Sequence, residues 1–193
     1  MNKFEIGGWA PSNYRTTDGH VPEELRKYYK ESESYNYQVR TKQNIMESDA
    51  TLAIATDFRS LGEMFTRFEC IRQAKLYEVF DLVKHRHNMT YLGNDSKAWY
   101  SYEYIEGFRS ERHLAELQKI RDFLVEFKIK TLNVAGNSEK TVPGITRYVI
   151  DILKDLFRYD TLGVERIISG GQTGADQAAT MFAILHNEAQ DAQ

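Results

Sequence analysis

The chain has little of what would indicate a secreted, membrane or nucleic-acid-binding protein. Its single cysteine, Cys70, excludes an intramolecular disulfide and a cysteine-rich metal site. No stretch approaches the roughly 20 apolar residues that a membrane-spanning helix needs, and residues 1–5 lack a signal-peptide pattern. The net charge of −3 gives no basic footprint for nucleic acid. We therefore expect a cytoplasmic protein with neither a nucleic-acid nor a membrane partner.

What the chain does have is the composition of an ordinary globular domain. Hydrophobic residues make up 41% of its 193 residues and charged residues 27%, both typical of folded proteins. A chain of this length can bury a sizeable core. We therefore predict one domain over residues 1–193.

The most informative stretch is Ile167–Gln177, near the carboxyl end. A short apolar run, 164–168, stops at Gly170 and Gly171, and an alanine-rich segment with helical spacing follows Gly174. This order predicts a strand, a tight loop and a helix. Glycines let a backbone come close to a ligand, and the free N–H groups at a helix start favour an anion. The pattern therefore predicts a phosphate-binding turn.

A purely structural interpretation of the same residues stays open. The dinucleotide fingerprint matches only in part, because Gly170 lies one residue too close to Gly171. Thr173 and Asp176 could instead form a variant capping box at the helix start, with the glycines serving only a sharp turn.

Strand-like and helix-like segments alternate along the chain, which predicts an α/β fold with a parallel sheet. Strands are expected near residues 4–7, 49–55, 99–105, 131–135 and 164–168, and helices over 22–30, 35–47, 110–130, 145–157 and 175–185, with residues 57–80 becoming helical through Leu76. Ligands bind at the carboxyl ends of the strands in open α/β sheets. Loops at those ends are therefore the first places to search for a site.

Several polar residues in such places could line a ligand site. Arg15 lies in a polar loop after the first strand, and Arg40 and Asn44 share one face of a predicted helix. Gly62 and Thr66 lie where another helix begins. Each has a structural alternative: a solvated loop for Arg15, a salt bridge inside the helix layer for Arg40, and a capped helix start for the last pair.

Residues 81–109 are the least readable part of the chain. Tyr100, Tyr102 and Tyr104 alternate along a predicted strand, so they share a face that could be a subunit contact, a stacking surface for a base or ordinary packed sheet. His85 and His87 lie two residues apart, but no third ligand accompanies them, so we predict no protein-bound metal.

Seven short motifs together resemble the family of putative molybdenum-cofactor carriers. They are Gly7–Pro11, Thr17–Gly19, Arg40–Asn44, Ser48–Thr51, Asn133–Gly136, Pro143–Ile145 and Ser169–Asp176. This family belongs to a Rossmann-like superfamily with the lonely-guy phosphoribohydrolases and the DNA-processing protein DprA. The resemblance implies a Rossmann-like parallel sheet with helices on both faces.

The order of the motifs differs from that of the family. Its members open with the Ser-Gly-Gly-Gln-Thr-Gly strand and helix, whereas here that unit, residues 164–187, lies at the carboxyl end. The resemblance therefore implies a circular permutation, with the loop at 157–165 joining the old ends. Residues 81–109 fall outside the resemblance and are interpreted as a family-atypical insertion.

The resemblance also implies a binding site at the carboxyl edge of the sheet. It nominates a phosphate loop and a set of residues that shape or flank the site. The loop is Gly170, Gly171, Gln172, Thr173 and Gly174, and the flanking residues are Gly8, Trp9, Arg15, Arg40, Asn44, Asp49, Gly62, Thr66, Gly136 and Asp176. Asp49 could equally cap a helix or bond Thr41.

One departure from the superfamily's motifs affects the expected catalytic activity. The lonely-guy enzymes carry P-G-G-x-G-T-x-x-E, where the glutamate assists cleavage of an N-glycosidic bond. Residues 61–69 keep Gly62, Thr66 and Glu69, but they place Glu63 and two bulky residues where small ones are needed. An anionic Glu63 beside a phosphate would be unfavourable. Glu69 is thus the catalytic candidate that this segment retains.

Two functions remain from the sequence. The favoured one is a non-catalytic carrier or sequestering protein for the molybdenum cofactor or for a nucleotide or NAD-derived molecule. The alternative is an N-glycosidase or phosphoribohydrolase that uses Glu69 or Asp176 with Arg40. We further expect a homo-oligomer, a dimer or tetramer, that associates through residues 95–108.

Overall fold

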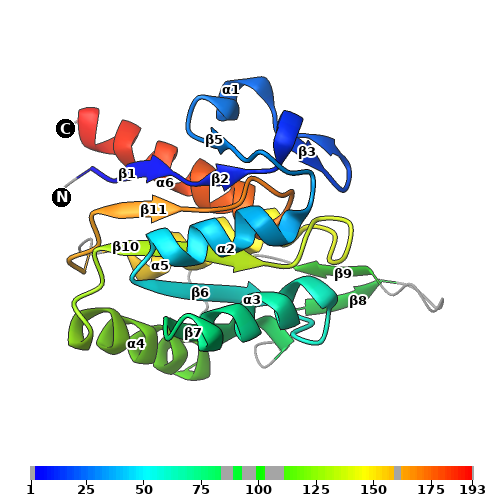
Figure 1. Ribbon diagram of the computed structural model, residues 1–193. Helices are drawn as coiled ribbons and strands as arrows, with labels where there is room; N and C mark the ends of the chain where they lie inside the picture. The colour runs from blue at the N-terminus through cyan, green and yellow to red at the C-terminus, as the bar shows by residue number, and fades with distance from the viewer. Residues whose placement is uncertain (1–2, 84–88, 93–98, 103–110, 159–161, 193) are drawn as a thin grey trace.

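Five parallel strands form the central sheet of the computed structural model, in the order β1-β11-β10-β6-β7 (Figure 1). Their bounds are Glu5–Gly7, Arg166–Ile168, Thr131–Gly136, Ala50–Ala55 and Leu76–Asp81, in that spatial order. The structure describes residues 3–83, 89–92, 99–102, 111–158 and 162–192. Strand β6 is buried along its whole length, as its largely apolar sequence predicts for a parallel strand covered on both faces.

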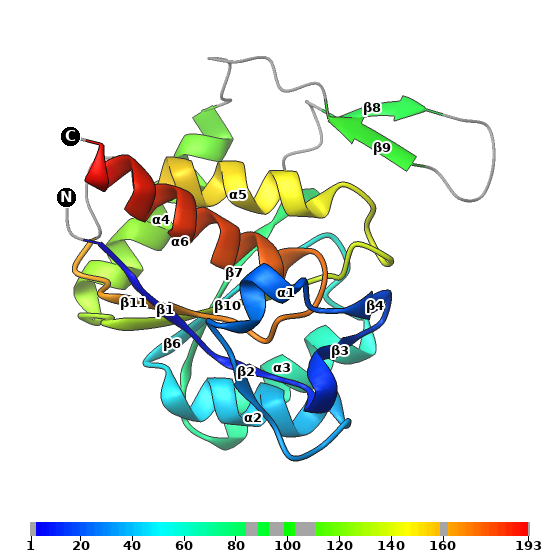
Figure 2. The same ribbon diagram turned by 90° about the horizontal axis from the view of Figure 1, so that it is seen from above.

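Helices cover both faces of the sheet (Figures 1 and 2). On one face lie α2 (Tyr37–Glu47) and α3 (Leu61–Arg72); on the other lie α4 (Glu111–Glu126), α5 (Ile145–Leu156) and α6 (Ala175–Asp191). This arrangement confirms the predicted Rossmann-like fold. None of the helices in the described ranges combines the length and the apolar character that crossing a membrane requires.

Short elements complete the chain. A cap over the sheet edge contains β2 (Trp9–Ala10), the 3-10 helix η1 (Ser12–Tyr14), β3 (Arg15–Thr16), β4 (Gly19–His20), α1 (Glu23–Arg26) and β5 (Lys30–Glu31). Strands β3 and β4 pair as an antiparallel hairpin, and β2 pairs with β5 in parallel. Strands β8 (Met89–Leu92) and β9 (Trp99–Tyr102) form a second antiparallel hairpin outside the main sheet.

The connections of the sheet diverge between β6 and β10. From β6 the chain passes through α3 to β7 on one side, and from β10 it passes through α5 to β11 on the other. In open α/β sheets a ligand crevice lies outside the carboxyl ends of the strands at such a switch point. The topology therefore directs attention to the residues that follow Ala55 and Gly136.

The last strand lies between the first strand and β10, so the two ends of the chain meet (Figures 1 and 2). The Phe4 N–H donates to Asn187 Oδ1 at 2.8 Å, and Asn187 Nδ2 donates to the Phe4 carbonyl at 2.9 Å. An ion pair between Lys3 and Asp191 adds a contact at the surface. This proximity is the geometry that a circular permutation requires.

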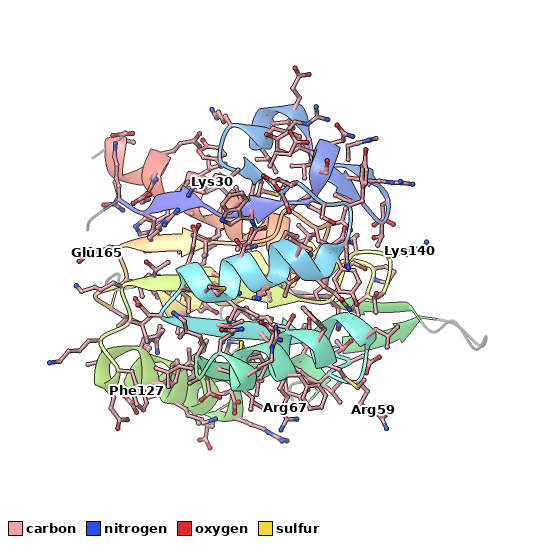
Figure 3. The ribbon with its side chains drawn as sticks, viewed as in Figure 1. Lys30, Arg59, Arg67, Phe127, Lys140 and Glu165 are labelled. Carbon is pink, nitrogen blue, oxygen red and sulfur yellow. The ribbon has the colours of Figure 1, made fainter. Side chains whose placement is uncertain are left out.

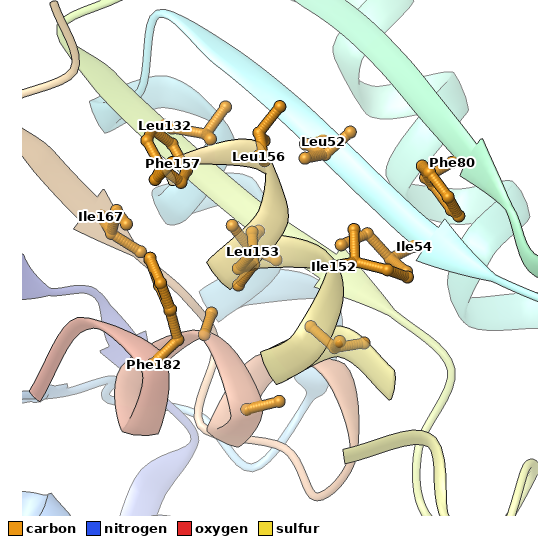
Figure 4. Packing of buried hydrophobic residues seen from close by; sticks show 14 of the residues in the cluster. Leu52, Ile54, Phe80, Leu132, Ile152, Leu153, Leu156, Phe157, Ile167 and Phe182 are labelled. Carbon is orange, nitrogen blue, oxygen red and sulfur yellow. The ribbon is translucent and has the colours of Figure 1, made fainter. Parts of the chain in front are cut away.

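The main core lies between the sheet and α4, α5 and α6 (Figure 4). The Phe157 ring stacks on Phe182 with centroids 5.7 Å apart and meets Phe4 edge to face at 5.2 Å. Leu153 of α5 and Ile167 of β11, both almost fully buried, lie between the helices and the sheet. Charged side chains such as Arg59, Arg67, Lys140 and Glu165 are exposed on the outside of these layers (Figure 3).

The helix predicted to run through Leu76 was wrong. Helix α3 ends at Arg72, Ala74 takes a left-handed conformation with φ of 51°, and the chain then enters β7 beside β6. Pairing with a fully buried neighbour strand overrides the helical spacing of the apolar residues. The helix predicted over 22–30 is likewise shorter, since it ends at Arg26 and Lys30 pairs with β2.

Part of the 81–109 prediction can be placed. The backbone of β9 confirms a strand at 99–102, paired with β8 rather than with the main sheet. Tyr104, His85 and His87 lie outside the described residues.

Candidate functional site

Two adjacent cavities lie at the carboxyl end of the sheet. The outer cleft has a volume of about 540 Å³, and the inner pocket beneath it about 50 Å³. The outer cleft is lined by Pro11, Arg15, Thr16, Thr17, Tyr35, Tyr37, Arg40, Ser60, Leu61, Gly62, Glu63, Gly136, Asn137, Ser138, Thr141 and Gln172. The inner pocket shares five of these and adds Thr41, Asn44, Thr66, Asn133, Val134, Ala135, Gly170 and Asp176. The cavities lie where the diverging connections predicted a crevice.

A buried ion pair forms the base of the site. Arg40 Nη1 lies 2.9 Å from Asp176 Oδ2, and the two side chains are 12% and 5% exposed. Arg40 comes from α2 and Asp176 from the first turn of α6, so the pair joins two helices across the sheet edge. Burial raises the pKa of the Asp176 carboxyl, and the guanidinium opposes that shift.

Gly170 leaves the space that this ion pair occupies. A Cβ at Gly170 would overlap the Arg40 guanidinium and would lie 2.7 Å from Asp176 Oδ2. Gly136 serves a comparable purpose, because its Cβ would overlap the Ile54 carbonyl and approach the Ala175 side chain at 2.7 Å. These glycines permit close approach within the protein itself.

The polar groups of the glycine loop are largely used inside the protein. The Gln172 N–H donates to Asp176 Oδ2 at 3.3 Å, so a carboxylate of the chain sits where the loop would present amides to an anion. Gln172 Oε1 accepts from the N–H groups of Thr17 and Thr173 at 3.2 and 2.9 Å. The loop therefore holds the β3–β4 hairpin against the sheet, and the hairpin forms one wall of the cleft.

The capping-box interpretation of the loop is wrong. Gly174, with φ of 85°, is the N-cap of α6, and its position carries no side-chain cap. The Thr173 hydroxyl donates instead to Asp18 Oδ2 at 2.6 Å, on the neighbouring hairpin.

The start of α3 lines the cleft with Ser60, Leu61, Gly62 and Glu63. Ser60 caps the helix by accepting from the Glu63 N–H at 3.5 Å, and Thr66 Oγ1 donates to the Gly62 carbonyl at 2.9 Å. Glu63 is only 4% exposed and lines both cavities. Burial and the nearby Asp176 raise the pKa of Glu63 to about 8, against the lowering effect of Arg40.

Asn137 connects the two strands at the switch point. Its Oδ1 accepts from the N–H groups of Thr56 and Asp57 at 2.9 and 3.0 Å, and its Nδ2 donates to the Asp57 carbonyl at 3.1 Å. The side chain thus fixes the loop after β6 to the end of β10, and it lines the outer cleft.

The comparisons with known proteins bear on the family and the fold. Residues 1–106 match the model of the circularly permutated YpsA SLOG family. The chain belongs to this family. The crystal structure of the "putative molybdenum carrier protein" from Syntrophus aciditrophicus SB superposes with a TM-score of 0.58 and 25% identity, covering 78% of this chain and 77% of that one. No curated protein matches the chain.

Membership of the YpsA SLOG family confirms two expectations. The resemblance inferred from seven motifs agrees with both the family match and the structural neighbour. The motif order that implied a circular permutation agrees with the family's own description and with the position of β11 beside β1.

In this member of the family, the structure places nine of the nominated residues on the cavities. They are Arg15, Arg40, Asn44, Gly62, Thr66, Gly136, Gly170, Gln172 and Asp176. Gly171, Thr173 and Gly174 belong to the loop but line neither cavity. Sequence reasoning missed Asn137 and treated Glu63 only as an obstacle; the first position after a buried strand was the signal for Asn137, and the first turn of the following helix was the signal for Glu63.

Two nominated carboxylates lie away from the cleft. Asp49 precedes β6, so it lies at the amino ends of the strands, away from the cleft. Its Oδ2 accepts there from the N–H groups of Lys130 and Thr131 at 2.9 and 2.8 Å. Glu69 lines a separate groove between α2 and α3 and is paired with Arg72 at 2.9 and 2.8 Å. These hydrogen bonds lower the pKa of Glu69. Neither residue can contact a ligand in the cleft from these positions.

Gly8, Trp9 and Asn44 form a structural unit beside the inner pocket. Asn44 accepts from the Trp9 N–H at 2.7 Å and donates to its carbonyl at 3.1 Å. A side chain of α2 thus supplies hydrogen-bond partners for the backbone of β2. The Trp9 ring nitrogen donates to Glu47 Oε1 at 2.7 Å, away from the cleft. Gly8, with φ of 130°, lies so close to Ser169 that a Cβ would overlap its carbonyl.

Within the ranges that the structure describes, no group of three or more histidine, cysteine, aspartate or glutamate side chains gathers as metal ligands do.

Proposed function

We propose that the protein binds a small, phosphate-bearing, nucleotide-like ligand in the outer cleft and acts as a carrier or sequestering protein. The observation that carries this proposal is the guanidinium of Arg40, which lies at the junction of the two cavities with a side chain only 12% exposed. A guanidinium at such a position can pair a phosphate bidentately. The solved relative is named a "putative molybdenum carrier protein", so the molybdenum cofactor is one candidate ligand and a nucleotide or NAD-derived molecule is the other.

The start of α3 is the place where we propose that the phosphate lies. Ser60, Leu61 and Gly62 line the outer cleft at the first turn of this 12-residue helix. The N–H groups and the positive dipole end of a helix favour an anion. Arg15 lines the same cleft from the β3–β4 hairpin. In this arrangement the glycine loop contributes the Gln172 side chain and the space at Gly170, rather than its own amides.

The rest of the outer cleft suits a ring and a sugar. Tyr35 and Tyr37 line it, and aromatic rings of this kind stack on heterocycles. The Thr16, Ser138 and Thr141 side chains line it as well, and hydroxyls can hydrogen-bond a ribose. A volume of about 540 Å³ falls in the usual range for small-molecule sites.

An N-glycosidase remains the alternative function, supported by a carboxylate other than Glu69 and Asp176, the two that the sequence suggested. Glu69 lies outside the cleft, whereas Glu63 lines it with a raised pKa, beside Arg40. A protonated carboxylic acid can serve as a general acid. Product formation from AMP or NAD, lost in Glu63→Gln and retained in Glu69→Gln, would support the enzyme.

Native mass spectrometry of the protein purified from cells tests the favoured function. We expect a pterin or nucleotide to accompany the wild type and to be lost from Arg15→Ala. Lys27→Ala removes the same charge from a position outside both cavities and should keep the ligand. Turnover of the released compound by the wild type would contradict the carrier role.

We further propose that the protein is a homo-oligomer. The predicted contact at 95–108 lies largely outside the described residues, but α3 offers a described surface. Leu61, Met64, Phe68 and Ile71 are 76%, 38%, 67% and 64% exposed and recur at a spacing of three and four residues. Such a stripe is typical of a helix–helix contact. Sedimentation analysis of the wild type and of Phe68→Glu tests this, and a wild-type monomer would refute it.

A further inference from the structure

The Glu63 carboxyl is a buried acid with an oxygen that lacks a protein partner. Its side chain belongs to a residue that is 4% exposed, and its Oε2 atom has no hydrogen-bond partner in the described part of the chain. Buried polar atoms in native proteins are almost always paired, so an unpaired one needs an explanation. Glu63 lines two adjacent cavities, so a molecule bound there is a candidate partner for its carboxyl.

The backbone N–H of Ser60 is a possible local partner for the Glu63 carboxylate, but Oε2 does not bond to it. Ser60 is the N-cap of α3 and Glu63 is three residues later, the spacing of a capping box. In a capping box the glutamate carboxylate accepts from the N-cap N–H. The serine half is present, with the Ser60 hydroxyl accepting from the Glu63 N–H, but within the described residues Oε2 receives no return bond from Ser60. Glu63 lines both cavities instead.

Five charged or titratable groups on Glu63's own helix and on neighbouring elements interact electrostatically with it. They are Arg40 on α2, Asp176 on α6, Asp57 in the loop after β6, Cys70 further along α3 and Tyr77 on β7. One cation and two carboxylates dominate this set. Burial and the two carboxylates together raise the pKa of Glu63 to about 8, so the group holds its proton at neutral pH. A protonated carboxyl is a hydrogen-bond donor, whereas an ionised one only accepts.

We propose that Glu63 contacts the ligand as a protonated acid, donating its O–H to a phosphate oxygen at the junction of the cavities, so that anion binding is coupled to a proton on this residue. The inference rests on the proposed function, because it requires a phosphate-bearing ligand in this cleft. It replaces the expectation that Glu63 repels a phosphate: the same side chain attracts it once protonated.

The charge of the site depends on this proton. The described residues that line the two cavities carry two cations, Arg15 and Arg40, and two acids, Asp176 and Glu63. With Glu63 protonated, the lining has one net positive charge, which favours an anion. With Glu63 ionised, the lining is neutral and the carboxylate faces the phosphate. Loss of the proton therefore removes a donor and adds a repulsion in one step.

Calorimetric titration with AMP between about pH 7.5 and 9.5 tests the proposal, because a phosphate monoester has already lost its second proton, whose pKa is near 6, in this range. We expect the association constant of the wild type to fall by nearly tenfold per pH unit above about pH 8. Repeating the titration in buffers of different ionisation enthalpy should show uptake of about one proton per AMP at the upper end of the range. Sulfate, which carries a constant charge, should show the same pH dependence.

Two variants separate this role from a structural one. Glu63→Gln keeps the shape and a donor, so it should bind AMP with an affinity that hardly changes with pH and without proton uptake. Glu69→Gln removes a carboxylate from the same helix but outside the cleft, and it should behave as the wild type. If Glu63→Gln does not fold, proton uptake by the wild type still tests the proposal.

The outcomes distinguish this inference from the proposed function. The proton coupling would be overturned if the AMP association constant of the wild type did not change with pH. It would also be overturned if that constant fell with pH as steeply in Glu63→Gln as in the wild type. Either result would leave the proposed carrier function intact. Failure of the wild type to bind either AMP or sulfate at any pH would overturn the proposed anion site, and the inference with it.

Discussion

The glycine loop after β11 and the first turn of α3 border the same cleft. They differ in whether their polar groups already have partners within the protein. In the loop, Gln172 bonds Asp176 and the neighbouring hairpin, and Gly170 accommodates the Arg40 guanidinium. At the start of α3, Glu63 has an unpaired oxygen, and a Cβ added to Gly62 would meet no atom within 4 Å. The glycine loop is thus the framework of the site. The first turn of α3 has an unpaired carboxyl oxygen and open space beside Gly62. Substitutions in the two regions should separate stability from binding.

Breaking the ion pair should have the largest effect on the framework. Arg40→Met leaves the Asp176 carboxylate buried without its guanidinium, and we expect a loss of about 3–5 kcal/mol in the free energy of unfolding, measured by urea denaturation. Lys130→Met serves as the control, because its pair with Glu165 is 57% and 69% exposed and should contribute less than about 1 kcal/mol. Equal losses in both variants would contradict a framework role for the buried pair.

A methyl group distinguishes the two regions directly. Gly136→Ala forces a Cβ against the Ile54 carbonyl, so we expect a loss of about 2–3 kcal/mol in stability. Gly62→Ala places the same methyl in open space within a helix, and it should raise stability by about 0.5–1 kcal/mol. Thermal unfolding of the two variants side by side is the measurement. A destabilised Gly62→Ala would show that the turn of α3 is less open than the structure indicates.

The buried acid should make stability depend on pH. Glu63 keeps its proton to about pH 8 in the folded state but releases it near its ordinary pKa of 4.5 when unfolded. Because the folded state binds more protons between these values, stability falls as pH rises from about 5 to 8 and then levels off. Glu63→Gln lacks this dependence. The difference in unfolding free energy between this variant and the wild type should therefore increase by about 2 kcal/mol or more from pH 5 to pH 8, in favour of the variant. Urea denaturation at pH 5 and pH 8 measures the gap; an unchanging gap would argue against a protonated Glu63.

The smallest effect on stability is expected at the cleft wall. Arg15 is exposed on the β3–β4 hairpin and lines the outer cleft, so Arg15→Ala should change stability by less than about 0.5 kcal/mol. AMP binding should nevertheless weaken about tenfold, which corresponds to about 1.4 kcal/mol. Titration calorimetry with Lys27→Ala as the charge-matched control measures this. Unchanged AMP affinity in Arg15→Ala would place the phosphate elsewhere in the cleft.

Much of the fold could be predicted because its strands are strongly marked. Residues 49–55 form an apolar run long enough for a buried strand, and β6 is buried throughout. Strand β7 could not be recognised, because Leu76–Asp81 mixes polar and apolar residues at an edge of the sheet, and its pairing with β6 is a tertiary contact. Local spacing favoured a continued helix there, and the neighbouring strand decided otherwise.

The sequence nominated residues that the structure brings together at one cleft, but it did not show how they contact one another. Arg40 and Asp176 lie 136 residues apart, and both were nominated, yet nothing in their spacing shows that they pair. Asp49 was nominated from its motif, but it lies at the amino end of its strand, so the direction of β6 carries it away from the cleft. Glu69 was chosen by its place in a nine-residue pattern, and the helical rotation between positions 63 and 69 turns it to another surface.

The sequence by itself determined the α/β class, the Rossmann-like family resemblance and the permuted order, because these depend on local patterns and on the succession of motifs along the chain. Only the tertiary structure decided which polar groups stay free. Asp176 and Gln172 satisfy the glycine loop because α2 and the β3–β4 hairpin pack against it, and Glu63 keeps an unpaired oxygen because no element of the described chain reaches its Oε2. Whether a buried polar group is structural or available to a ligand depends on what surrounds it in space, and a linear sequence does not specify those neighbours.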